Sequence, residues 1–128
     1  MRGLRLLLYV GLAALCLTTW LVWSMQRLTI QPEPFNSARW KEMAAAGHMN
    51  NDPGCYRGAM ALGAIESREL IGKSSVELST LLGRPENTAA NRWLYPVGQC
   101  SGDWVHSTLV ITFSNEGVVA DAELRRES

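Results

Sequence analysis

Residues 104–125 read WVHSTLVITFSNEGVVADAELR, and apolar and polar side chains alternate along most of this stretch. Alternation with period two is typical of a β-strand that buries one face. In residues 104–113, one face collects Ser107, Leu109, Ile111 and Phe113, and the other collects His106, Thr108, Val110 and Thr112. Residues 114–117 (Ser-Asn-Glu-Gly) favour a tight turn. The stretch therefore predicts a hairpin whose second strand covers residues 118–125.

A third strand is predicted upstream, at residues 92–95. It is expected to stop at Pro96, because proline cannot donate to a sheet ladder. Residues 97–103 contain two glycines and Cys100, and we expect them to form a loop. The three strands make an antiparallel meander with one apolar face. Helices must pack on that face, since it would otherwise expose a large apolar surface to water.

Two helices are predicted to cover the sheet. Residues 74–77 (Ser-Ser-Val-Glu) form a capping box, in which a serine hydroxyl and a glutamate carboxylate satisfy the first amides of a helix. Gly83 and then Pro85 end this helix. An earlier helix is predicted over residues 55–68, where apolar residues recur at helical spacing. The predicted fold class is α+β, a small two-layer domain with two helices packed on a three-stranded antiparallel sheet.

The N-terminal segment is of a different kind. No charged residue occurs between Arg5 and Arg27, and sixteen of the twenty residues 6–25 are apolar. A helix of about 20 apolar residues crosses the ~30 Å hydrocarbon core of a bilayer, and two tryptophans near its far end suit the membrane interface. We interpret the segment as an N-terminal transmembrane helix. Two alternatives stay open: a cleaved signal peptide, and a lipoprotein signal at Cys16, where Leu15 replaces the usual small residue.

The chain therefore divides into a membrane anchor (residues 1–25), a linker with a short helix (residues 26–54) and an α+β domain (residues 55–128). Twelve basic and twelve acidic residues give zero net charge, and without Arg2 and Arg5 the rest of the chain carries −2. This balance provides no basic footprint for nucleic acid. A short N-terminus with two arginines favours the cytoplasmic side. We therefore expect a single-pass inner-membrane protein whose domain faces the periplasm, the alternative being an exported or outer-membrane lipoprotein.

Beyond the anchor the sequence has two cysteines, Cys55 and Cys100. An even pair on the exported side of a membrane is the pattern of one structural disulfide. The alternative is a pair of buried free thiols. The chain has no Cys-x-x-Cys motif, so a redox-active site is not expected.

The sequence carries no arrangement typical of catalysis. His48 and His106 have no spacing suited to a metal, and neither Gly-x-Ser-x-Gly nor a phosphate-binding loop occurs. Cys100 lies in a glycine-rich segment without a positioned base, which favours a disulfide over a nucleophile. We therefore expect no enzymatic activity, no cofactor and no metal.

Three aromatic residues form the candidate binding surface: Trp93, Tyr95 and Trp104. Large aromatic side chains concentrate where proteins bind partners. Packing under the predicted helices explains the same residues, so this alternative stays open. The expected partners are the membrane and an envelope protein, with lipid headgroups as a further candidate.

Two groups of short segments match a known pattern. The first group is LIGKSSVEL (residues 70–78) and LLGRP (residues 81–85), and the second is WLY (93–95), LVITF (109–113) and EGVV (116–119). Over residues 55–125 they resemble the SmpA/OmlA (BamE-like) family of small envelope proteins. The resemblance implies a non-enzymatic protein that acts by binding, accessory to outer-membrane protein assembly or envelope integrity. Similar two-helix, three-strand domains occur in β-lactamase inhibitor proteins, so the alternative is an inhibitor or accessory subunit of a periplasmic enzyme.

Overall fold

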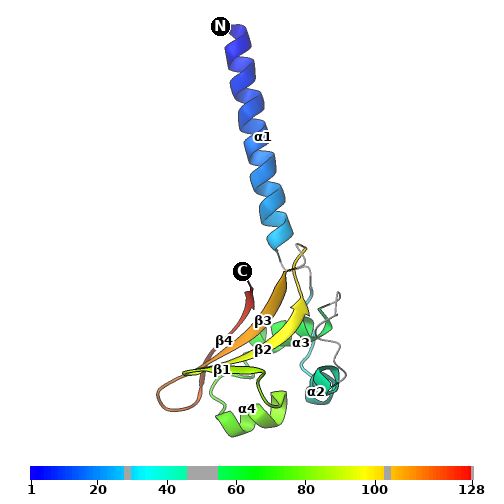
Figure 1. Ribbon diagram of the computed structural model, residues 1–128, viewed down its shortest axis with the longest axis vertical. Coiled ribbons are helices and arrows are strands. Elements are labelled where there is room, and N and C mark those ends of the chain that lie inside the picture. Colours follow the sequence, from blue (N-terminus) through cyan, green and yellow to red (C-terminus); the bar gives the residue numbers. More distant parts are fainter. Residues whose placement is uncertain (28–29, 46–54, 103–104, 128) are drawn as a thin grey trace.

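The computed structural model describes residues 1–27, 30–45, 55–102 and 105–127 of the chain. In chain order the elements are α1 (Arg2–Gln26), α2 (Ser37–Ala45), α3 (Tyr56–Glu66), α4 (Ser75–Leu82), β1 (Asn87–Ala89), β2 (Arg92–Gln99), β3 (His106–Phe113) and β4 (Val119–Arg126). Helix α1 stands away from a small domain that contains the other elements (Figure 1). The predicted α+β architecture with an apolar N-terminal helix is confirmed, but the number of strands and the number of helices packed in the domain differ from the prediction.

The sheet has four strands in the order β1-β2-β3-β4, and each neighbouring pair is antiparallel. The prediction of three strands is wrong because it omits β1, which has three residues, all exposed. Strand β1 pairs with residues 92–94 of β2 through its backbone. So short a strand, without a buried side chain, leaves no period-two pattern in a sequence.

Strand β2 continues past Pro96 to Gln99, although the sequence predicts its end at Pro96 and a loop after it. Proline is tolerated in a sheet at edges and at bulges, where its missing N–H costs little. Both conditions hold here. The pairing of β1 with β2 stops at Leu94, so β2 has no neighbouring described strand on that side beyond this point. The β2–β3 register also shifts between Pro96 and Gly98.

Three helices pack within the domain: the two predicted to cover the sheet and α2, which the sequence predicts as a short helix in the linker. Helix α3 contacts β2, β3 and β4 and lies behind the sheet in Figure 1. Helix α4 lies at one end of the sheet, where Tyr95 Oη donates to the carbonyl of Gly83 at 2.9 Å. Helix α2 contacts both α3 and α4, and its Trp40 is fully buried. The sequence of α2 is only weakly amphipathic, which is why its part in the core was not predicted.

The hydrophobic core lies between the sheet and the helices. It includes Trp40 from α2, Met60 from α3, Leu78 and Leu82 from α4, Tyr95 and Val97 from β2, and Leu109, Ile111 and Phe113 from β3. The predicted inward face of β3 is confirmed, because Ser107 is buried together with the three apolar residues that alternate after it. We call this the inner face of the sheet.

The capping box at the start of α4 is confirmed. Ser74 Oγ accepts from the amide of Glu77, and the Glu77 carboxylate accepts from the amide of Ser74 at 2.8 Å. These bonds to Ser74 hold the pKa of Glu77 below its usual value. Gly83 ends the helix at φ 76°, a backbone conformation that suits glycine.

A segment between α1 and α2 is docked on the domain. We call residues 30–36 the strap. Ile30 and Phe35 pack against the core, and the amide of Glu33 donates to the carbonyl of Ala59 at 3.0 Å. A Cβ added at Gly63 of α3 would lie 1.8 Å from the carbonyl oxygen of Glu33. Glycine at this position therefore lets the strap lie directly on α3.

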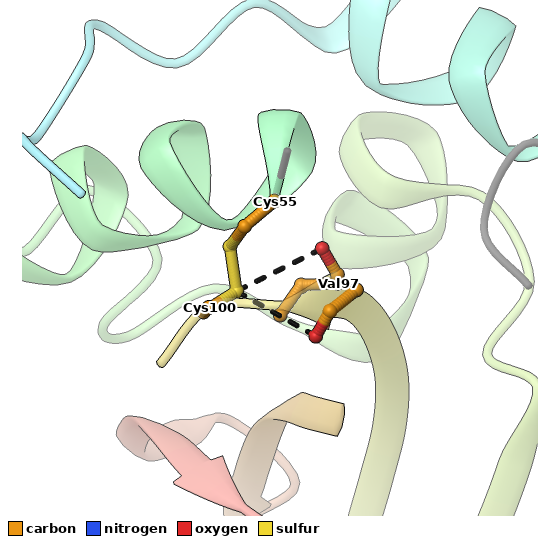
Figure 2. The surroundings of a disulfide bond; sticks show 4 residues. Cys55, Val97 and Cys100 are labelled. Atoms are coloured by element: carbon orange, nitrogen blue, oxygen red, sulfur yellow. Dashed lines mark hydrogen bonds between the residues drawn. A yellow bond between two sulfur atoms is a disulfide. The ribbon is translucent and has the colours of Figure 1, made fainter. Parts of the chain in front are cut away.

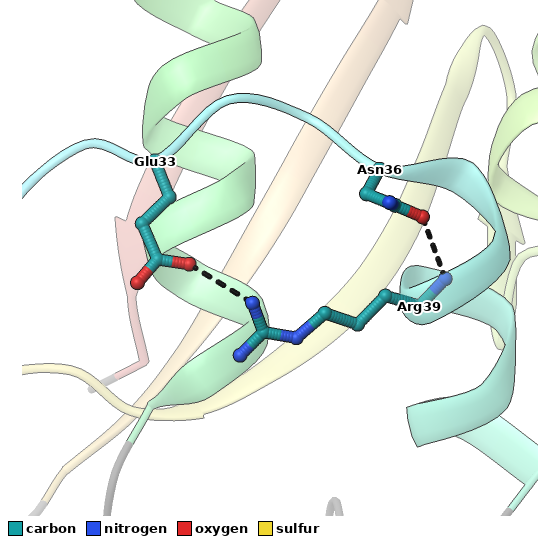
Figure 3. A network of polar contacts seen from close by, with 3 residues as sticks. All are labelled: Glu33, Asn36 and Arg39. Carbon is teal, nitrogen blue, oxygen red and sulfur yellow. Dashed lines mark hydrogen bonds and ion pairs between the residues drawn. The ribbon is translucent and has the colours of Figure 1, made fainter.

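Polar contacts continue the strap into α2 (Figure 3). Asn36 Oδ1 accepts from the amide of Arg39 at 2.9 Å, which caps the start of the helix. The Arg39 guanidinium also pairs with Glu33 at 3.3 Å. This ion pair is half exposed and contributes little by itself, but it joins the first turn of α2 to the middle of the strap.

Gly63→Ala is expected to lower the free energy of unfolding by about 1–3 kcal/mol, because the added methyl group meets backbone rather than a movable side chain. Gly11→Ala is the matched control, since an added Cβ there meets nothing within 4 Å. Urea denaturation of the full-length protein in detergent measures both. Equal unfolding midpoints for the two variants would show that the strap is not held on α3.

Candidate binding surfaces

Helix α1 has 25 residues, none of them buried. At 1.5 Å per residue it is about 37 Å long, enough to cross the hydrocarbon core of a bilayer. Among the described residues, α1 is the one helix that is long and apolar enough to cross a membrane.

The end of α1 lies next to the domain. A Cβ added at Gly102 would be 3.3 Å from the carbonyl oxygen of Met25, and the Arg27 guanidinium stacks over the Trp23 ring at 4.4 Å. In Figure 1 the helix rises from the end of the sheet where β2 ends, and the chain ends on the same side. This end of the domain therefore lies nearest to any membrane that α1 spans.

The structure separates the three aromatic residues proposed as a binding surface. Tyr95 is 1% exposed, and its ring meets Trp40 at 6.2 Å between centroids. Trp93 is partly buried and packs edge-on against Phe113 at 5.0 Å. Trp104 lies outside the described residues. Tyr95 therefore belongs to the core. Trp93 is partly accessible to solvent, so of the two described aromatic residues it is the one that a partner could contact.

Arg57 is a buried cation that the sequence reasoning missed. It is 4% exposed, with its guanidinium 3.8 Å from the centre of the Trp40 ring and one terminal nitrogen donating to the carbonyl of Pro96 at 3.4 Å. Burial lowers its pKa to about 10, although the nearby Tyr95 and Glu86 oppose the shift. Burial raises the pKa of Tyr95.

A signal for Arg57 is present in the sequence. It lies three, four and seven residues before the apolar positions at 60, 61 and 64, which is the buried face of α3. A charged residue in such a series indicates that its side chain is buried with the apolar residues.

Arg57→Met is expected to leave the free energy of unfolding unchanged or to raise it, because methionine keeps an apolar stem beside Trp40 and removes a buried charge. Arg57→Ala is expected to lower it by about 2–4 kcal/mol, since a cavity replaces the stem. Chemical denaturation at pH 7 measures both. If methionine were as harmful as alanine, the charge rather than the stem would be the stabilising part.

The structure joins Cys55 to Cys100, so that a buried disulfide ties the start of α3 to the end of β2 (Figure 2). Cys100 Sγ lies 3.9 Å from the carbonyl oxygen of Val97. A disulfide sulfur has no hydrogen to donate, so this is a packing contact. A Cβ at Gly58 would lie 2.1 Å from Cys55 Sγ, so glycine is needed beside the bridge. Cys100 in this state offers no thiolate for nucleophilic chemistry.

The other side of the sheet, which we call the outer face, has no described helix packed on it (Figure 1). Strand register places three cross-strand rows there: Leu94, Val110 and Glu123; Pro96, Thr108 and Arg125; and Arg92, Thr112 and Asp121. Apolar side chains lie in the middle of this face and charged ones on β4. The sequence predicts the alternation, but Thr108 and Val110 on this face are buried as well, although no described helix covers it.

A groove of about 290 Å³ runs across the outer face. We call it the outer groove, and its lining residues are Glu86, Asn87, Leu94, Pro96, Thr108 and Glu127. The amide of Glu86 donates to the carbonyl of Leu94 at 3.1 Å, and that of Glu127 donates to the carbonyl of His106 at 2.8 Å. The sheet therefore fixes the backbone of both acidic residues. Trp93 and Tyr95, the two described residues of the aromatic set proposed from the sequence, do not line this groove.

The described part of the chain brings no three His, Cys, Asp or Glu side chains together as a metal site. His106 is exposed on β3, and His48 lies outside the described residues. Comparisons with protein-family models, curated proteins and solved structures give no match to the chain.

Proposed function

We propose that this protein is a membrane-anchored binding module of the bacterial cell envelope, with its α+β domain facing the periplasm. The observation that carries the proposal is a sheet face that no described helix covers, on a domain docked beside the end of an apolar helix of membrane-spanning length. A sheet face without a covering layer is a common place for a partner to bind. The strap shortens the connection, so the face is held close to the membrane surface.

The compartment is argued from the disulfide and the N-terminal charges. Cys55 and Cys100 form a buried bridge, and such bridges persist in oxidising compartments such as the periplasm. Arg2 and Arg5 precede the apolar helix and favour a cytoplasmic N-terminus. The domain, at the other end of a single span, would then be periplasmic.

The resemblance to the SmpA/OmlA (BamE-like) family supports a role accessory to outer-membrane protein assembly or envelope integrity. The capped helix α4, which carries much of that resemblance, is built as the motif implies. Inhibition or support of a periplasmic enzyme is the second candidate, since a sheet face that no described helix covers also suits an enzyme surface. The identity of the bound protein separates the two.

Photocrosslinking in native membranes tests the proposal. A photoreactive residue is placed at Asn87 or at Asp121, both exposed on the outer face, and at Asn115 in the 114–117 turn as the control. We expect a discrete protein adduct from the first two positions and none from the control. Assembly-machinery subunits in the adduct would favour the first role and a soluble enzyme the second. Adducts of equal yield from Asn115, or to lipid alone, would contradict the proposal.

A further inference from the structure

The outer groove combines an apolar floor with acidic walls. Leu94 and Pro96 form part of its lining from β2, and Glu86 and Glu127 contribute carboxylates from segments next to β1 and β4. Thr108 Oγ1 donates to Glu127 Oε1 at 2.5 Å, which orients that carboxylate and leaves its other oxygen to accept further hydrogen bonds.

The two carboxylates have no ion-pair partner in the described part of the chain. The ion pairs there join Glu33 with Arg39 and Glu123 with Arg125. The charge of the buried Arg57 reaches Glu86 through space, but its guanidinium is stacked on Trp40. Among the described residues, the lining of the groove therefore contains two acidic side chains and no basic one.

We propose that the outer groove binds the side chain of an arginine or lysine from a polypeptide segment of the partner. The aliphatic stem would lie on Leu94 and Pro96, and the charged head would be bound by Glu86 and Glu127. Long basic side chains combine an apolar stem with a cationic head in this way, and hydrogen bonds between ionised groups are strong. A volume of about 290 Å³ suits one such side chain and is small for an organic cofactor.

The apolar part of the groove lining favours a polypeptide side chain over a free inorganic cation. Leu94 and Pro96 offer the aliphatic stem of a basic side chain a contact that an inorganic cation could not use. The backbone edge of β2 does not contribute, because the carbonyl of Pro96 already accepts from Arg57, and Val97 and Gly98 are buried. The inference rests on the proposed function, since it names the chemistry by which the outer face recognises its partner.

Peptide titration by NMR tests the groove, with ¹⁵N-labelled full-length protein in detergent micelles. The probe is acetyl-Gly-Arg-Gly-amide, and its control is the same peptide with neutral citrulline in place of arginine. We expect saturable shifts at the amides of Leu94, Thr108 and Glu127 with the arginine peptide and at least tenfold weaker binding of the citrulline peptide. Equal affinity for the two peptides, or no saturable shift, would overturn the inference.

Charge-removal variants assign the effect to the two carboxylates. E86Q/E127Q is expected to weaken binding of the arginine peptide at least tenfold, and each single variant is expected to weaken it by less. E116Q is the matched control, because Glu116 is exposed in a turn and does not line the groove. An unchanged circular dichroism spectrum shows that each variant is folded. Wild-type affinity in E86Q/E127Q would overturn the inference.

Spermidine distinguishes a free polyamine from a polypeptide. If it bound at least as tightly as the arginine peptide, with the same shifts, the groove would be a polyamine site and the inference would be wrong. Failure of the peptide titration together with a protein adduct from Asn87 would refute the groove chemistry alone. Loss of the adduct itself would refute the proposed function.

Discussion

Replacing Cys55 and Cys100 by alanine together is expected to lower the free energy of unfolding by about 4 kcal/mol. The bridge joins residues 45 apart, and closing a loop of that length restricts the unfolded chain by about this amount in the entropy model. For a domain of roughly one hundred residues, this is a large share of a typical total of 5–15 kcal/mol. Urea denaturation of the full-length protein in detergent, without reductant, measures the change.

Cys16→Ala is the matched control, because Cys16 is a free cysteine exposed on α1. It is expected to leave the unfolding midpoint unchanged. Thiol labelling of denatured wild-type protein without reductant should modify Cys16 and spare the other two. Labelling of all three cysteines, together with an unchanged midpoint in the double variant, would refute a structural disulfide.

Trp40→Ala is expected to cost about 3–5 kcal/mol, the range for removing a buried tryptophan. Trp40 is 0% exposed, and its indole nitrogen donates to the carbonyl of Leu82 at 3.0 Å. Its ring also supports the guanidinium of Arg57 at 3.8 Å. Removing it therefore opens a cavity, leaves a buried carbonyl unpaired and exposes one side of a buried cation.

Thermal and urea unfolding, followed by circular dichroism, measure the loss in Trp40→Ala. Trp20→Ala provides the control, since Trp20 lies exposed on α1, away from the domain core. We expect the control to unfold as the wild type does. If Trp40→Ala also unfolded like the wild type, α2 would not be part of the cooperative core.

The parts of the fold that follow local rules could be predicted from the sequence. The capping box at Ser74 and the inward-facing set of β3 that begins at Ser107 depend on neighbouring residues, and both are present. The pairing of Cys55 with Cys100 follows from the number of cysteines once the anchor is set apart. These features need no knowledge of which elements meet.

Features that depend on tertiary contacts could not be predicted. Strand β1 pairs by backbone alone, and β2 passes Pro96 because its neighbour ends before that point. Helix α2 contributes the buried ring of Trp40 and, at the margin of the core, Met43. Each depends on where a distant segment lies, and a periodic pattern carries no such information.

The candidate site shows the same division. Tyr95 was proposed for binding as an aromatic residue, and the structure buries it beneath Trp40. The outer groove instead unites Glu86 and Glu127, which are polar residues in unremarkable sequence contexts. The sheet register brings them to one face, and this could be seen only after β1 and the end of β4 were placed.

The central claim is a single-pass membrane protein whose domain lies outside the cytoplasm, and a topology reporter tests it most directly. A reporter enzyme that folds only in the periplasm, fused after residue 128 and expressed in a bacterial host, is expected to be active and to remain in the membrane fraction. A reporter that works only in the cytoplasm is expected to be inactive at the same position. Activity of the cytoplasmic reporter, or release of the fusion into the soluble fraction, would contradict the account.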